Sequence, residues 1–193
     1  MFSYHFQVGN VNVYPGPFLF FLLVICPVAL IIGVIFLSKR IKSMIAYCQA
    51  GEYEKSISLA YKLLNRYTRS RNMFRTKSLQ RNIEIVHFYL AISYLGLSKY
   101  AEFWECINKL ELQKNLKNSW IAVYYILQKD VAEVKRYTEQ IEPTEDMQVM
   151  LPLLKGVVLC EEGQADEGKE RLTEILPKIK TTLLKQIISQ YIS

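Results

Sequence analysis

The sequence predicts an all-α protein, in which a single N-terminal transmembrane helix continues into an α-solenoid of helical hairpins and ends in a C-terminal capping helix. Three observations predict this fold class. Residues 18–37 form an apolar run without a charged residue. Glycine and proline are sparse, at eight and six of 193 residues, while leucine, isoleucine, lysine and glutamate are abundant, which favours helices. Similar short segments recur between the expected helices.

The apolar run is long enough to cross a bilayer. Twenty helical residues rise about 30 Å, the thickness of the hydrocarbon core, and this run has no polar face. Three cations follow it at once, whereas no charged residue precedes it, and cationic flanks stay in the cytoplasm. We therefore expect a plasma-membrane protein with an extracytoplasmic tail at 1–17, a transmembrane helix at 18–38 and a cytoplasmic domain at 39–193.

The order of charge and apolar residues indicates a retained anchor. A secretory signal peptide carries its basic residues before the apolar core and a small-residue cleavage site after it, and here the order is reversed. Within the anchor, Pro27 is expected to kink the helix. Ala29 and Gly33 are four residues apart, a small-residue pair that would let another membrane helix approach closely. Small residues are also common in such helices without any partner.

Helical spacing of apolar residues continues through the rest of the chain. No glycine or proline interrupts residues 38–50, so the membrane helix is expected to run on to Gly51. The second helix is expected to end in a basic turn from Arg66, and Asp130 and Thr144 are candidate N-caps. The further expected helices cover residues 57–64, 79–95, 100–110, 120–127, 131–141, 147–160, 165–176 and 179–192.

Internal similarity gives these helices an architecture. Tyr47 to Ser56, Tyr94 to Phe103 and Leu159 to Gly168 each place a small or polar residue at a helix break. This resembles the tetratricopeptide repeat, a helix-turn-helix unit with Gly at the turn, an aromatic residue two later and a small residue three beyond. The matching residues are Gly51, Tyr53 and Ser56 in the first copy, and Gly156, Gly163, Ala165 and Gly168 in the last.

The resemblance is incomplete in the middle of the chain. The copy at Ser98 and Tyr100 has the bulky Phe103 where a small residue is expected, which puts close helix packing in doubt there. Residues 120–141 match almost nothing. The three turns are 47 and 65 residues apart, more than the 34-residue period of the family. A generic helical bundle is the alternative.

Basic charge gathers beside the expected membrane. Residues 39–81 hold eleven Lys and Arg against Glu52 and Glu54, whereas residues 82–193 have a net charge of −3. A basic segment at 62–81 would contact anionic lipid, each cation contributing about 1 kcal/mol. A solvated face and nucleic-acid binding are the alternatives, and the membrane anchor argues against nucleic acid. The predicted lipid contacts are Lys39, Arg40, Lys42, Arg66, Arg69, Arg71, Arg75 and Lys77.

No motif in the sequence carries catalysis. His5 and His87 are the only histidines, and His87 stands among apolar residues of a helix. Phosphate-binding loops, nucleophile elbows and cysteine pairs with metal spacing are absent from the sequence. We therefore expect no enzyme, no cofactor and no metal.

Two functions remain. The first is a non-catalytic scaffold that docks a protein partner, as an adaptor or as an accessory subunit of a membrane complex. An integral membrane protein is one candidate for that partner. By the repeat resemblance, Phe88, Ile92 and Leu95 would face the partner groove, although core is the safer assignment for any one of them. The alternative is a lipid-responsive regulatory protein that uses its basic juxtamembrane segment. The layout is also similar to mitochondrial import receptors, which leaves an organellar membrane open.

Overall fold

The computed structural model describes residues 6–8, 11–13, 26–71, 77–111 and 114–193, and of residues 6–8, 11–13, 26–37 and 69–71 it describes the backbone only. The chain divides into two units, residues 1–42 and 43–193. Each unit is considered on its own below.

The first unit contains a β-hairpin that the sequence reading did not anticipate. Strands β1 (Phe6–Val8) and β2 (Val11–Val13) pair antiparallel, with Phe6 opposite Val13. Apolar residues alternate along both strands, and Gly9-Asn10, a dipeptide typical of hairpin turns, joins them in the sequence. The expected tail at 1–17 therefore includes regular structure.

Helix α2 (Cys26–Ala50) begins inside the expected transmembrane segment and continues without a break through residues 38–50. Within the described residues, no helix combines the length and apolarity that a membrane crossing requires. Residues 18–25 of the expected span lie outside the described chain. Ala29 and Gly33 lie in α2, but their side chains are not among those described, so their predicted contact with another membrane helix stays a prediction.

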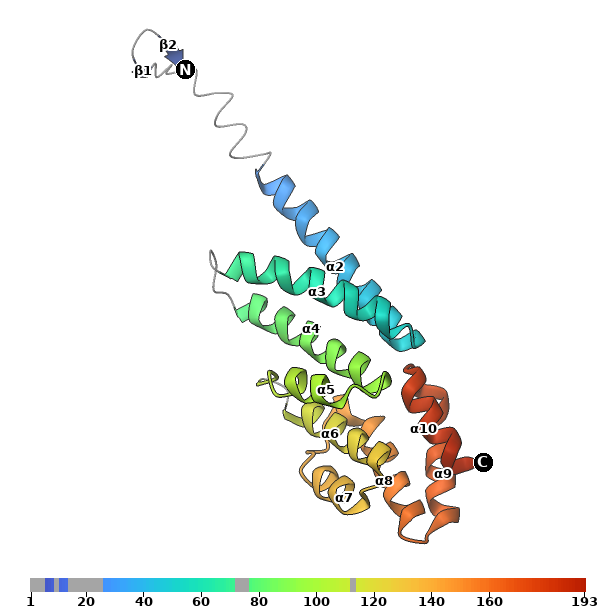
Figure 1. The fold of residues 1–193 in the computed structure, drawn as a ribbon. Helices are drawn as coiled ribbons and strands as arrows, with labels where there is room; N and C mark the ends of the chain where they lie inside the picture. Colours follow the sequence, from blue (N-terminus) through green and yellow to red (C-terminus); the bar gives the residue numbers. More distant parts are fainter. Residues whose placement is uncertain (1–5, 9–10, 14–25, 72–76, 112–113) are drawn as a thin grey trace. The chain divides into compact units, whose positions relative to one another are not determined.

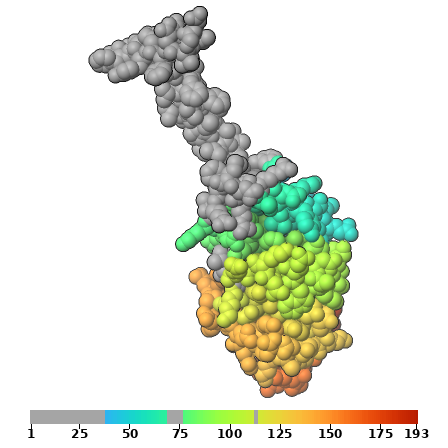
Figure 2. Space-filling view, turned by 60° about the vertical axis from the view of Figure 1, so that its left-hand side comes forward, coloured from blue at the N-terminus to red at the C-terminus, as the bar shows by residue number. Residues whose placement is uncertain are grey.

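The second unit is all-α, as predicted, and its helices pack as successive antiparallel hairpins (Figure 1). Figure 2 shows α3 to α8 following one another over the surface in chain order. Besides the end of α2, the described helices of this unit are α3 (Tyr53–Arg71), α4 (Lys77–Gly96), α5 (Tyr100–Ile107), α6 (Lys114–Gln128), α7 (Val131–Glu139), α8 (Met150–Glu161), α9 (Ala165–Ile175) and α10 (Thr182–Ile192), with short 3₁₀ turns η2 (Glu145–Met147) and η3 (Leu176–Lys178).

Helix α3 is longer than predicted. The basic turn expected from Arg66 is wrong, because α3 continues to Arg71. Tyr67 extends the buried face of Ala60 and Leu63 by one more turn and is only 2% exposed. Apolar burial at this position outweighs the repulsion among the neighbouring cations.

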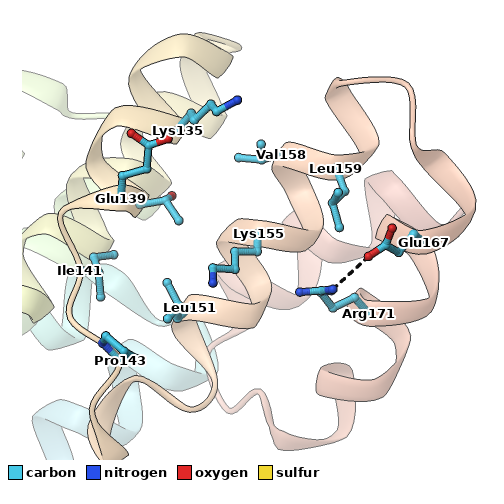
Figure 3. Close-up of a pocket in the computed structure, with 11 residues that line it drawn as sticks. Lys135, Glu139, Ile141, Pro143, Leu151, Lys155, Val158, Leu159, Glu167 and Arg171 are labelled. Atoms are coloured by element: carbon cyan, nitrogen blue, oxygen red, sulfur yellow. Dashed lines mark hydrogen bonds and ion pairs between the residues drawn. The ribbon is translucent and has the colours of Figure 1, made fainter.

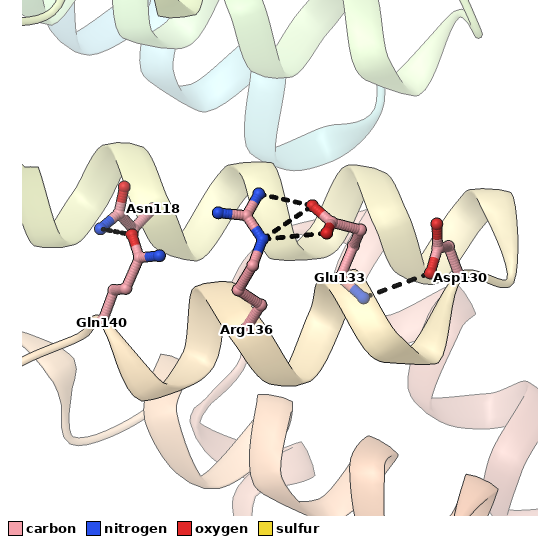
Figure 4. Close-up of polar contacts among 5 residues, drawn as sticks. All are labelled: Asn118, Asp130, Glu133, Arg136 and Gln140. Atoms are coloured by element: carbon pink, nitrogen blue, oxygen red, sulfur yellow. Dashed lines mark hydrogen bonds and ion pairs between the residues drawn. The ribbon is translucent and has the colours of Figure 1, made fainter.

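Both cap predictions can be compared with the structure. The Asp130 carboxylate accepts a hydrogen bond from the Glu133 backbone N–H at 3.2 Å, so the predicted N-cap of α7 is confirmed (Figure 4). Thr144 precedes η2 but forms no side-chain cap, so that prediction is wrong. The connection before α8 is instead held by Asn115, whose side chain bonds both backbone groups of Glu142.

The same turn closes four described hairpins. In each turn one residue takes a positive φ, and the next backbone N–H donates to the carbonyl five residues earlier, as in a Schellman motif. The residues with positive φ are Gly51, Ser98, Lys129 and Gly163. The four bonds, of 2.9 to 3.0 Å, run from Glu52 to Tyr47, Lys99 to Tyr94, Asp130 to Tyr125 and Gln164 to Leu159.

The turn at Lys129 is the copy that sequence comparison missed. With it, the turns begin at residues 47, 94, 125 and 159, and so follow one another after 47, 31 and 34 residues. The first interval is longer because α3 and α4 have 19 and 20 residues. Lys129 hid this copy, since it occupies the left-handed position that glycine fills in two of the others.

Replacing Lys129 with glycine is expected to stabilise the domain by about 0.5–1 kcal/mol. At a φ of 57°, a Cβ is strained and glycine is not. Gln128→Gly, one residue earlier and inside α6, is the matched control and is expected to destabilise by about the same amount. Thermal unfolding of both variants checks the pair, and a less stable Lys129→Gly variant would contradict the expected relief of strain.

Small residues allow close packing where the repeat resemblance placed them. A Cβ on Gly168 of α9 would lie 2.8 Å from the Gly156 carbonyl oxygen of α8. In the first hairpin, the buried Ser56 hydroxyl donates to the Met44 carbonyl at 3.2 Å and lies 3.0 Å from Ser93 Oγ of α4. Phe103, which replaces a small residue, is fully buried and stacks on Tyr124 of α6 with ring centroids 5.6 Å apart.

Helix α10 packs on α8 and α9 and also reaches the first hairpin (Figure 1). The Thr182 hydroxyl donates to the Gln49 carbonyl at 2.8 Å, across 133 residues of sequence. At its other end, the Tyr191 hydroxyl donates to the Glu161 carboxylate at 2.7 Å. The last helix of the domain therefore links its first and last hairpins.

Candidate partner-binding groove

An apolar groove of about 430 Å³ lies between α7 and the α8–α9 hairpin (Figure 3). Helix α7, the connection after it, α8 and α9 all contribute to its lining. The lining residues are Lys135, Thr138, Glu139, Ile141, Pro143, Leu151, Lys155, Val158, Leu159, Glu167 and Arg171. Its volume is within the usual range for ligand-binding clefts.

The floor of the groove combines two core side chains with two that are only partly covered. Ile141 and Val158 are 5% and 9% exposed, and Leu151 and Leu159 are half-buried. Helix α8 is apolar on nearly all sides, because one face packs on α9 and a second lies toward α7. Part of that second face stays open to the groove, where Leu151 is half-buried and Ile141 and Pro143 of the connection after α7 form the other side.

Three cations stand around this floor, and two of them are paired. The Lys135 ammonium lies 2.7 Å from a Glu162 oxygen, and this hydrogen bond raises the pKa of Lys135. Arg171 lies 3.0 Å from Glu167 on the same helix. Among the described residues, Lys155 has neither a hydrogen bond nor an ion pair, and in Figure 3 it extends from α8 toward the wall with Glu139 and Ile141.

Two further polar groups of the groove are already occupied. The Thr138 hydroxyl donates to the Val134 carbonyl at 2.7 Å, within α7. The Ile141 N–H donates to the Thr138 carbonyl, and Pro143 has no N–H. Chemically, the groove offers apolar contact area, the unpaired ammonium group of Lys155 and, on the opposite wall, the carboxylate of Glu139.

A second hollow, of about 500 Å³, lies between α4, α6 and the connection before α8. Arg81 and Lys114 contribute cations to it, and Glu142 and Asp146 contribute acids. It is larger than the groove, but its lining is polar and of mixed charge, so it offers an apolar ligand little to bury.

The predicted partner-groove residues lie in the core. Phe88, Ile92 and Leu95 of α4 are 7%, 2% and 1% exposed. Phe88 contacts Trp120 of α6 edge to face, with ring centroids 6.0 Å apart. These burial values agree with the safer assignment to core.

The structure describes the side chains of only some of the predicted lipid contacts. Lys39, Lys42, Arg66 and Lys77 are exposed, and Arg40 is half-buried. Arg69 and Arg71 belong to α3, but their side chains are not described, and Arg75 lies outside the described residues. Contact with lipid therefore stays a prediction.

The groups best suited to catalysis are largely buried, and burial shifts their pKa values. Burial raises the pKa of the Cys48 and Cys106 thiols to about 11, so both are protonated at neutral pH. Burial, together with nearby Lys109, lowers the pKa of His87, whose Nδ1 lies buried without a hydrogen bond. In the part of the chain that the structure describes, no three His, Cys, Asp or Glu side chains come together as metal ligands. His5 lies outside that part.

Sequence reasoning missed the groove. Its residues come from three helices and a connection, so no single stretch shows a pattern. The one available signal was α8 itself, which is too apolar for a helix buried on one face only. The half-buried rings of Trp104, Tyr124, Tyr125 and Tyr137 contact one another across α5, α6 and α7.

Comparison with family models, with curated proteins and with solved structures finds no match for this chain. The fold and the groove therefore stand on the chain's own sequence and structure.

Proposed function

We propose that this protein is a non-catalytic, membrane-anchored adaptor whose helical domain docks a partner protein in the groove between α7, α8 and α9. The observation that carries the proposal is the apolar floor of that groove. Other apolar side chains of the described surface, such as Leu64 and Tyr124, are also half-buried, but the groove gathers its apolar side chains in a hollow. An open apolar cleft rimmed by charges is typical of a protein-binding site.

The anchor is proposed from the sequence. An uncharged run at 18–37, followed by Lys39, Arg40 and Lys42, supports a single span with the helical domain in the cytoplasm. We also propose a tetratricopeptide-type solenoid. The recurring turn and the small residues between paired helices support it. Successive helical hairpins of this kind serve as interaction scaffolds because they present extended surfaces.

Replacing Leu151 with arginine is expected to remove the partner. The new charge would lie over the apolar floor, and losing a central contact costs roughly 2 kcal/mol or more, about 30-fold in affinity. The measurement is quantitative recovery of proteins that co-purify with the full chain in mild detergent. Leu151 is half-buried, so thermal unfolding is compared first to show that the variant folds.

Glu170→Arg on the exposed side of α9 is the matched control, since it adds an arginine outside the groove. It is expected to keep every partner of the unmodified chain. Equal recovery with the Leu151→Arg variant would overturn the groove as the docking site, and the absence of any reproducible partner would overturn the adaptor.

A further inference from the structure

We infer that the groove takes an amphipathic α-helix of the partner, with an apolar stripe over the floor and a carboxylate opposite Lys155. The inference rests on the proposed function and names the chemistry of its partner.

The occupant is a helix because the groove offers an extended segment no continuous row of backbone groups to pair with. Its walls are helices, whose backbone groups bond within each helix. The two residues of the connection that line the groove add no free N–H, because the Ile141 N–H is donated to Thr138 and Pro143 has none. An extended peptide would bury unpaired backbone groups against Leu151, Val158 and Leu159, whereas a helix pairs its own.

The charge on the occupant follows from the rim. Lys135 and Arg171 are already neutralised by Glu162 and Glu167. Lys155 stands between them on α8 with no acid partner among the described residues, so a carboxylate is the group that complements the groove at this point. Glu139 lines the opposite wall and would repel a carboxylate placed nearer to α7. The acidic edge of the partner helix therefore lies toward Lys155.

The test uses three fluorescent model peptides and the full chain in mild detergent, with detergent alone as the blank. The first two are helical and share a leucine stripe with i, i+3, i+4, i+7 spacing, flanked along one edge by glutamate or by lysine. The third has the composition of the glutamate peptide, with central prolines that prevent a helix. Binding is measured by fluorescence anisotropy.

The glutamate helix is expected to bind at least about tenfold more tightly than the lysine helix, and the proline peptide more weakly than either. Lys155→Glu is expected to reverse the preference for glutamate over lysine. Lys185→Glu, an exposed position on α10, makes the same change in net charge and is expected to leave the preference unchanged.

Equal binding of the two helices, tighter binding of the proline peptide, or an unchanged preference in Lys155→Glu would each overturn the inference. Its failure can be told apart from failure of the adaptor. If no helix binds selectively while Leu151→Arg still loses the native partner, the groove docks a partner of another chemistry and the proposed function stands. If the peptides bind selectively while Leu151→Arg keeps every native partner, the proposed docking site fails instead.

Discussion

The Gly168→Ala variant is expected to be about 2 kcal/mol less stable than the unmodified chain. Its new methyl group would lie 2.8 Å from the Gly156 carbonyl oxygen and 2.9 Å from the Cys160 backbone nitrogen, so α8 and α9 would have to separate. Overpacking of this kind costs about 1–3 kcal/mol or more, and the better helix propensity of alanine offsets at most about 1 kcal/mol. Chemical denaturation measures the free energy of unfolding.

Two further variants show whether the backbone contact is the cause. Glu170→Ala, two residues along the same helix and exposed, is expected to change stability by no more than about 0.5 kcal/mol. Adding Cys160→Ala to Gly168→Ala removes the thiol that would clash with the new methyl group, but leaves the two backbone contacts. The double variant should therefore stay destabilised, and full recovery would show that only the thiol was in the way.

The Ile188→Asp variant is expected to release α10 and, with it, the protection of the first hairpin turn. Ile188 is fully buried, and replacing it with a carboxylate forfeits its apolar contacts and buries a charge, which together cost roughly 4 kcal/mol or more. Because the Thr182 hydroxyl bonds the Gln49 carbonyl, losing α10 uncovers residues 49–52. Hydrogen exchange of the Gly51 and Glu52 amides is the measurement, since these residues lie far from the mutation in sequence.

Gln186→Asp is the matched control, because it adds the same carboxylate on the exposed side of α10. Protection at Gly51 and Glu52 should stay as in the unmodified chain. If Ile188→Asp removed hydrogen-exchange protection from α10 alone, the prediction would be wrong. Helix α10 would then stabilise the last hairpin but not the first.

Much of the helical fold can be predicted from local pattern. The helix breaks at Gly51, Ser98 and Gly163 are visible in the sequence because each ends an apolar periodicity with a residue suited to a turn. The cap at Asp130 is visible for the same reason. Local pattern fails at Lys129, where a lysine takes a backbone conformation that glycine prefers, and at Arg66 to Arg71, where burial of Tyr67 prolongs α3.

The candidate site could not be predicted in the same way. The repeat resemblance predicts that Phe88, Ile92 and Leu95 line a groove, because a repeat presents its first helices to a partner. In the structure all three pack in the core. Which face of a helix stays open depends on the angle and length of the elements beside it. Helix α7 ends at Glu139, and Leu151 and Leu159 of α8 stay half-buried in the groove, which no pattern within α8 reveals.

By itself, the sequence determined the helical class, most helix ends, the small residues at Ser56, Gly156 and Gly168, and the gathering of positive charge at residues 39–81, because these depend on neighbours along the chain. Only the tertiary structure decided that the turn at Lys129 repeats the others, that Thr182 of the last helix meets Gln49 of the first hairpin, and that an apolar groove with one unpaired lysine opens beside α8. Those features depend on how separate helices pack in space, and packing brings together residues that no periodicity connects.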